Sequence, residues 1–205
     1  MSSLVSAADV TLADLQKMTA RYAPVSLRVD TSKLSAGDKA ALARLIEAGR
    51  LINHLFLQQI WSGNPGMEAE LRRDQTPLGR ARYEYFELNK GPWSDLDDHQ
   101  AFLPGVPPRK PEGANFYPQN ITKAEFEAWA KTLSPGARTL AEGFFSVITR
   151  GADGKLRAVP YAEAYKQDLA ALAALLRDAA KATDNATLKH FLELRADAFL
   201  SNDYY

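Results

Sequence analysis

Two side chains that follow a candidate β-hairpin are the first in this sequence that could do chemistry. Glu163 and Tyr165 stand at the start of a helical pattern, where the helix dipole favours a carboxylate and a phenol can extend over the first turn. This placement would suit a ligand-binding site. The alternative is that Tyr165 packs in the core, because it also lies on the apolar stripe of the same helix.

Aromatic and amide side chains in a stretch rich in glycine and proline form a second candidate group. They are Trp93, Asn115, Phe116 and Tyr117. They could line a ligand cleft, since such sites combine apolar walls with a few polar groups. The alternative is that these side chains are the apolar anchors that hold a long loop against the body of the protein.

The histidines provide no local metal site. His54, His99 and His190 are far apart, and no H-E-x-x-H sequence is present. His190, Glu193 and Asp197 share one helix face, but we expect a solvated polar face there, because a metal needs further ligands from elsewhere. The absence of cysteine excludes thiol nucleophiles, disulfides and thiolate metal sites.

Three carboxylates, Asp95, Asp97 and Asp98, gather in a short loop and could meet Ca²⁺. The loop lacks the glycine and the terminal glutamate of an EF-hand, so we expect turn and cap roles instead. Other catalytic motifs are absent: there is no G-x-S-x-G, P-loop or dinucleotide fingerprint, no Nudix motif rich in glycine and glutamate, and no paired Glu-x-x-His. These residues alone indicate only a helical domain.

Composition limits the partners of the chain. Its 205 residues carry 25 Lys+Arg and 25 Asp+Glu, a formal net charge of +0 with no long block of either sign. This balance argues against nucleic acid or an anionic membrane as the main partner. No run approaches the ~20 apolar residues of a membrane helix, so we expect a soluble protein, and no secretory signal is visible at Met1 to Val10. The compartment stays open between cytoplasm and, after processing, periplasm.

Periodicity predicts a mainly α fold: a single helical domain over residues 1–205 with one β-hairpin, a long Pro/Gly-rich loop and a C-terminal αα-hairpin. The loop runs from Asn89 to Asn120, and its aromatic residues favour a loop pinned to the body over a disordered one. Strands are predicted from Phe144 to Thr149 and from Lys155 to Val159. The predicted helices cover Asp9 to Arg21 and Ala36 to Trp61, then start at Asn64, Thr76, Thr122, Ser134, Pro160 and Asp184.

Local signals predict how these elements begin and end. The predicted N-caps include Ser35, Asn64 and Asp184, and Thr122 with Glu125 forms a predicted capping box. Pro24 to Lys33 alternates apolar and polar residues, which indicates an extended segment laid against an apolar surface. The last helix has no Gly, Pro or basic turn at its end, so we expect it to be cut rather than capped and the chain to be a fragment.

Five stretches of the sequence are distinctive as a set. They are Leu78-Gly-Arg-Ala-Arg-Tyr83, Asn89-Lys-Gly-Pro-Trp93, Pro104-Gly-Val-Pro-Pro108, Gly113-Ala-Asn-Phe-Tyr-Pro118 and the end of the chain from Phe191 to Tyr205. Together they resemble the N-terminal part of bacterial proteins of the dipeptidyl peptidase III family, zinc-dependent exopeptidases that release dipeptides from peptide N-termini. The resemblance covers about Leu15 to Tyr205.

The resemblance implies a two-lobed enzyme with a cleft between its lobes, in which a later part of the chain binds the catalytic zinc, so that no cofactor is expected in this chain. It implies that Glu163 and Tyr165 face the peptide substrate, the carboxylate pairing with the free α-ammonium group and the phenol donating to a peptide carbonyl. Asn115 and Phe116 are the further substrate-side candidates. We therefore expect the substrate-side lobe of a zinc metallopeptidase, inactive alone, whose surface could associate where the other lobe would lie.

The alternative is a stand-alone helical binding or scaffold domain that kept the fold of the lobe without its chemistry. A folded monomer or a defined dimer with a cooperative melt would favour this alternative.

Overall fold

The computed structural model describes residues 10–204, and the chain divides into two compact units. One unit combines Met1–Leu27 with Leu57–Asn115, and the other combines Arg28–Phe56 with Phe116–Tyr205. The described residues are mainly helical, which confirms the predicted fold class. The predictions that concern Met1 to Asp9, and the last residue of the chain, fall outside the described residues.

The first unit is built on three helices and one apolar core. Thr11 and Asp14 form a capping box that starts α1, and Thr76 accepts from the Gly79 N–H to start α4 as predicted. The helices are α1 (Leu12–Thr19), α3 (Asn64–Arg73) and α4 (Pro77–Asn89). The core consists of Leu15, Leu57, Tyr85, Phe86, Phe102 and Leu103.

The long Gly/Pro-rich connection is held by its aromatic residues, as predicted, but it also contains strands that the sequence did not reveal. Trp93 and Phe102 are 1% and 2% exposed, and the Trp93 indole N–H donates to the Pro107 carbonyl at 2.9 Å. β1 (Trp93–Ser94) pairs antiparallel with β2 (Gln100–Ala101), around a 3₁₀ turn, η2 (Asp95–Asp97). The prediction of a single hairpin is therefore wrong, because a ladder of two residues per strand is too short to show a period-2 pattern.

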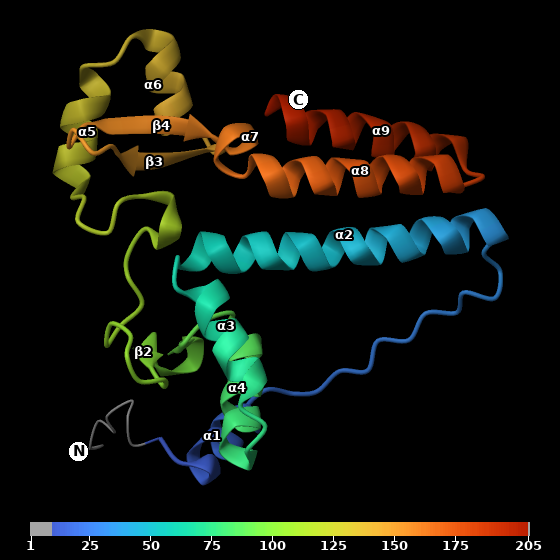
Figure 1. The fold of residues 1–205 in the computed structure, drawn as a ribbon, viewed down its shortest axis with the longest axis horizontal. Helices are drawn as coiled ribbons and strands as arrows, with labels where there is room; N and C mark the ends of the chain where they lie inside the picture. Colours follow the sequence, from blue (N-terminus) through green and yellow to red (C-terminus); the bar gives the residue numbers. More distant parts are fainter. Residues whose placement is uncertain (1–9, 205) are drawn as a thin grey trace. The chain divides into compact units, whose positions relative to one another are not determined.

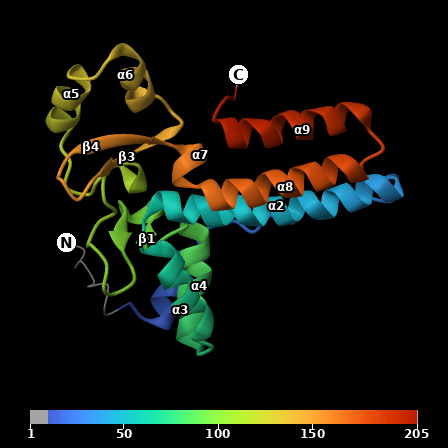
Figure 2. The ribbon, with the colours of Figure 1, turned by 45° about the horizontal axis from the view of Figure 1, so that its top comes forward.

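The second unit contains a long helix packed with the predicted αα-hairpin. α2 (Ala36–Ile60, whose last residues belong to the first unit) lies beside α8 (Lys166–Ala182), and α9 (Ala186–Ser201) folds back along α8 (Figures 1 and 2). Their shared core is small and aliphatic: Ala41, Ala48, Leu55, Leu169, Leu172, Ala173, Leu176, Ala179, Ala180, Leu192 and Ala196. Small side chains between α8 and α9 allow these two helices to approach closely.

The start of α2 is tied to the turn between α8 and α9 by reciprocal hydrogen bonds. The Ser35 hydroxyl accepts from the Asp38 N–H at 3.0 Å, which confirms the predicted N-cap, and donates to Asp184 at 2.6 Å. The Thr183 hydroxyl donates to the Asp38 carboxylate. Each helix terminus thus satisfies polar groups of the other.

The predicted hairpin is present in the second unit, next to two short helices. β3 (Ser146–Arg150) pairs antiparallel with β4 (Leu156–Pro160), with Ile148 opposite Ala158. α5 (Lys123–Lys131) and α6 (Pro135–Glu142) lie beside it (Figure 1). Ala141, Ile148 and Leu156 form its core with Phe126 and Trp129 packed on them.

Three predicted caps are wrong in detail. Asn64 does not cap α3; Gly63 takes that position, and the buried Asn64 amide donates instead to the Leu57 and Lys90 carbonyls, both at 3.0 Å. Asn185, not Asp184, caps α9, because Asp184 is engaged by Ser35. Thr122 accepts from the Glu125 N–H, but the Glu125 carboxylate pairs with Arg150 at 2.9 Å rather than closing a capping box. In each case a partner distant in sequence determines the role.

Two predictions about apolar contact and helix ends are also wrong. Within Pro24 to Lys33, the alternating Val25, Leu27 and Val29 side chains are 77%, 89% and 81% exposed, so this stretch is not laid against an apolar surface. α9 is capped rather than cut: Asn202 adopts the left-handed conformation (φ 65°, ψ 12°) and its N–H donates to the Ala198 carbonyl. Asparagine can take this place of glycine at a helix C-terminus.

Candidate functional site

The segment that carries Glu163 and Tyr165 follows directly from the hairpin. β4 ends at Pro160, and α7 (Tyr161–Ala164) forms one turn whose first N–H donates to the Phe145 carbonyl at 2.9 Å. Tyr165 then interrupts the helix with φ −116° and ψ 27°, before α8 begins. The sequence pattern predicted a continuous helix here; the break turns Glu163 and Tyr165 to directions that a straight helix would not give.

Glu163 lines an open hollow of about 480 Å³ in the second unit. Its wall comes from the α7 segment, from the first turn of α8 and from the end of α9. The lining residues are Pro160, Ala162, Glu163, Lys166, Ser201 and Asn202, a set that we name the Glu163 hollow. The Glu163 hollow is therefore lined by the exposed Glu163 carboxylate, the exposed Lys166 ammonium group and the Asn202 amide.

Asn202 is the most constrained polar residue of the Glu163 hollow. Its side-chain N–H group donates to the Phe145 carbonyl at 3.1 Å, the same carbonyl that accepts from Tyr161. Its Oδ1 atom is buried and has no hydrogen-bond partner among the described residues. A buried acceptor without a donor is costly.

A cluster of aromatic rings surrounds the base of α7. The Tyr161 ring lies 6.2 Å from Phe116 in a stacked arrangement, 5.3 Å from Tyr165 and 6.4 Å from Phe145. Burial, reinforced by the neighbouring Tyr165, raises the pKa of Tyr161 to about 12. Tyr204 lies 4.5 Å from Phe145, and burial raises its pKa as well. These phenols therefore remain protonated donors at neutral pH.

The four predicted substrate-side residues do not all fall in one unit. Phe116, Tyr165 and Glu163 belong to the second unit, the first two joined through the Tyr161 ring. Asn115 belongs to the first unit, where its amide donates to the Gln58 carbonyl at 2.9 Å. The shared role of all four in substrate binding stays a prediction.

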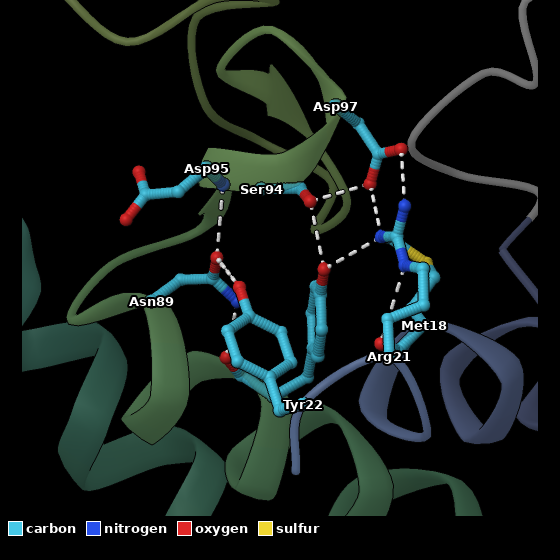
Figure 3. A network of polar contacts seen from close by, with 8 residues as sticks. Met18, Arg21, Tyr22, Asn89, Ser94, Asp95 and Asp97 are labelled. Carbon is cyan, nitrogen blue, oxygen red and sulfur yellow. Dashed lines mark hydrogen bonds and ion pairs between the residues drawn. The ribbon is translucent and has the colours of Figure 1, made fainter.

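The loop carboxylates of the first unit are held by protein groups, as the turn interpretation predicts. Asp97 accepts hydrogen bonds from the two terminal nitrogens of Arg21. Asp98 pairs with Arg109 at 2.6 Å, and Asp95 lies 3.1 Å from His99. Figure 3 shows how Arg21 and Asp97 face each other across the loop. The hydrogen bond from the Arg21 guanidinium holds the pKa of Asp97 below its usual range, and the Ser94 hydroxyl adds to this effect. Partial burial of the carboxylate acts in the opposite direction and is outweighed.

A second branch of this network fixes the end of α4. The side-chain oxygen of Asn89, Oδ1, accepts from the Tyr22 hydroxyl at 3.1 Å and from the Asp95 backbone N–H at 2.9 Å (Figure 3). Its N–H group donates to the Tyr85 carbonyl at 2.8 Å. Because every polar atom of Asn89 is engaged, we assign this network a structural role.

Residues 10–204 contain no cluster of metal-ligating side chains. No group of three or more His, Asp or Glu side chains in that range could hold a metal ion. Asp197, one of the three residues on the candidate helix face, pairs with Arg177 at 2.6 Å, and His190 and Glu193 are exposed.

Sequence reasoning missed Asn202 and Lys166 as members of the hollow. One signal for Asn202 was available: an asparagine directly after a periodic helix can adopt the left-handed cap conformation. Its position beside Glu163, 39 residues earlier in the chain, follows only from the packing of α9 on α8.

This chain is similar to one segment of several longer proteins. No protein-family model matches. The solved structure of dipeptidyl-peptidase III from Corallococcus sp. strain EGB is 52% identical with a TM-score of 0.90, over 95% of this chain and 36% of that one. The structure of DPP III from Caldithrix abyssi is 40% identical with a TM-score of 0.86, over 93% of this chain and 36% of that one.

A protein with a different name shares the same segment. Nudix hydrolase 3 of Arabidopsis thaliana is 32% identical over 93% of this chain and 31% of that protein. The sequence analysis did not anticipate this relative, because the segment lacks the Nudix motif. The chain thus spans about a third of the length of each of these relatives. Among the residues the structure describes, no helix has the length and apolar character to cross a membrane.

Proposed function

Because the chain is a dipeptidyl peptidase III-like segment, we propose that it is the substrate-side lobe of a zinc dipeptidyl peptidase and holds the free N-terminus of a peptide. The observation that carries this proposal is that Glu163, an exposed carboxylate, and Asn202, an amide with an unpartnered Oδ1, line the same hollow. Both are acceptors, and an α-ammonium group carries three N–H donors.

Two aromatic residues of the second unit complete the proposed peptide site. Tyr165 donates a hydrogen bond from its hydroxyl to a peptide carbonyl. Phe116, which stacks on the Tyr161 ring next to Tyr165, provides an apolar wall. A carboxylate that pairs with the terminal ammonium sets the register from which a dipeptidyl peptidase counts two residues.

The described residues do not fit a zinc ion, since they offer no suitable donor group. We therefore propose that zinc belongs to the larger, unmatched part of a full-length chain, and that the 205-residue chain is inactive by itself. Its peptide affinity alone is weak, because an open hollow leaves a ligand largely in water.

A stand-alone binding or scaffold role is the second candidate, and one observation favours it. The same segment matches a protein named for a different hydrolase chemistry over 93% of its length. A fold that accompanies two differently named activities could serve as a binding module in both.

The proposal predicts a large effect of Tyr165→Phe on peptide cleavage. The test uses a chimera in which this chain replaces the matched segment of the Corallococcus dipeptidyl-peptidase III. Loss of one donor to the reacting carbonyl should lower kcat/KM for dipeptide release at least tenfold, about 1.4 kcal/mol or more. The matched control, Tyr83→Phe, changes a half-buried tyrosine on α4 and should leave kcat/KM within twofold. Equal kinetics for both variants would remove Tyr165 from the site.

A second prediction concerns recognition of the free amino group. Glu163→Gln in the same chimera should raise KM at least tenfold, about 1.4 kcal/mol, because the charge-assisted hydrogen bond to the ammonium is lost. Glu193→Gln, an exposed carboxylate on α9, is the control. N-acetylated peptides should bind the parent chimera poorly. With these peptides, the KM values of the parent and of the Glu163→Gln variant should differ less than with free peptides. An unchanged KM in that variant would contradict ammonium binding by Glu163.

A further inference from the structure

α2 carries two apolar faces, of which only one is buried. Ala41, Ala48 and Leu55 point into the core shared with α8 and α9. A second set lies on the exposed surface of the helix: Leu42, Ile46, Ile52 and Phe56, which are 36%, 50%, 48% and 47% exposed. We name this second set the α2 stripe.

The α2 stripe is continuous on the helix surface. At 100° per residue its four side chains fall within an arc of about 120°, centred roughly 100° away from the buried face. A helix that packs on one side only is expected to be polar over the rest of its surface, whereas apolar residues on two faces are typical of a helix enclosed between two layers. α2 therefore has the pattern of an enclosed helix with one layer present.

Gly49 lies at the centre of the α2 stripe and supports the same interpretation. A Cβ atom added there would meet nothing within 4 Å among the described residues, so no contact in this structure requires glycine. Glycine inside a helix is destabilising relative to alanine. A residue without a side chain at the middle of an apolar face allows another backbone to approach closely.

The solved relatives are longer than the segment that they share with this chain. The segment keeps its fold at a TM-score of 0.90 within a chain of which it is only 36%. We propose that the α2 stripe is the docking face for the unmatched part of a full-length dipeptidyl peptidase III-like chain, which contributes an apolar helix or strand across Gly49. This inference rests on the proposed function for the identity of its partner, and on the exposed residues of α2 for its position.

Cysteine labelling tests the proposal directly, because the native chain has no cysteine. Ile46→Cys places a thiol in the α2 stripe, and Ala43→Cys places one on an exposed position of the same helix outside it. The rates of maleimide labelling, located by mass spectrometry, are compared between the 205-residue chain and the chimera. We expect position 46 to be protected at least tenfold in the chimera and position 43 less than twofold.

Three results would overturn the proposal. Equal labelling of position 46 in both proteins would show that the remainder does not cover the stripe. Equal protection of both positions would show a general loss of access. A dimeric 205-residue chain that already protects position 46, and becomes monomeric on Ile46→Glu, would identify a second copy as the occupant.

Two provisions keep the test decisive. If the chimera does not fold, the same cysteines are placed at the aligned positions of the Corallococcus chain and of its matched segment. Because labelling does not require catalysis, protection without peptidase activity would support docking while contradicting the proposed function, and activity without protection would do the reverse.

Discussion

Asp97 is the residue on which the polar network of the first unit converges. As a carboxylate it only accepts, so the Ser94 hydroxyl donates to it, and the Tyr85 hydroxyl, 2.7 Å from Ser94, donates in turn to Ser94. Arg21 donates to Asp97 and, at 3.1 Å, to the Tyr85 hydroxyl. One carboxylate thus orders Arg21 after α1, Tyr85 of α4 and Ser94 of β1.

The network predicts a pH dependence of stability. Because the pKa of Asp97 is lower in the folded protein, its stabilisation is fully present above the unfolded value of about 3.9 and is lost as the pH falls through the folded pKa. Asp97→Asn should lower the free energy of unfolding at pH 7 by roughly 1 kcal/mol, a value discounted because the pair is about a third exposed. The difference from the native chain should shrink towards pH 2, as measured by urea denaturation.

Asp98→Asn is the control for this experiment. Asp98 is the adjacent carboxylate and has its own arginine partner, but the side chains of that pair are 73% and 62% exposed. Its substitution should change stability by less than about 0.5 kcal/mol at either pH. A cost for Asp97→Asn that persists unchanged at pH 2 would indicate packing rather than charge.

At the scale of elements, two glycines of α2 have opposite surroundings. A Cβ atom on Gly37 would lie 2.4 Å from the Ala182 carbonyl oxygen and 2.7 Å from the Asp184 carboxylate, whereas one on Gly49 would meet nothing. Gly37→Ala should therefore lower the free energy of unfolding by about 1–3 kcal/mol, because the turn between α8 and α9 must move. Gly49→Ala should raise it by roughly 0.5–1 kcal/mol through the helix preference of alanine.

Urea denaturation of the two alanine variants side by side provides the measurement. Each variant controls for the other, since both make the same change in the same helix. A similar loss of stability in both would mean that α2 responds to alanine itself rather than to contact at its N-terminus.

At the scale of the whole molecule, the division into two units raises the question of whether the units unfold together. The chain passes from one unit to the other after Leu27, Phe56 and Asn115, so neither unit is a continuous piece of sequence. α2 places Leu55 in the core of the second unit and Leu57 in that of the first. We therefore propose that residues 1–205 unfold as a single domain with one transition.

This proposal is tested by following each unit separately in urea. In Trp129→Phe the remaining tryptophans, Trp61 and Trp93, pack on each other at 5.2 Å in the first unit and report on it by fluorescence. Hydrogen exchange of the α8 and α9 amides reports on the second unit. Coincident midpoints are expected; two separated transitions would identify two independent domains.

The sequence by itself determined what depends on neighbours along the chain. Apolar periodicity located α2, α4 and the αα-hairpin, two strand-like runs around a glycine-containing turn located β3 and β4, and Thr76 before Pro77 marked a helix start. These features arise from backbone hydrogen bonds and side chains within a few residues, so a local pattern is sufficient to predict them.

Only the tertiary structure decided what depends on residues far apart in the chain. Asn64 binds carbonyls 7 and 26 positions away instead of capping α3, and Asp184 meets Ser35, 149 positions away, instead of capping α9. Asn202 lies beside Glu163 because α9 folds back on α8. No local pattern contains these contacts, since a polar side chain takes the partner that folding places within hydrogen-bond distance, and burial makes a partner obligatory for Asn64.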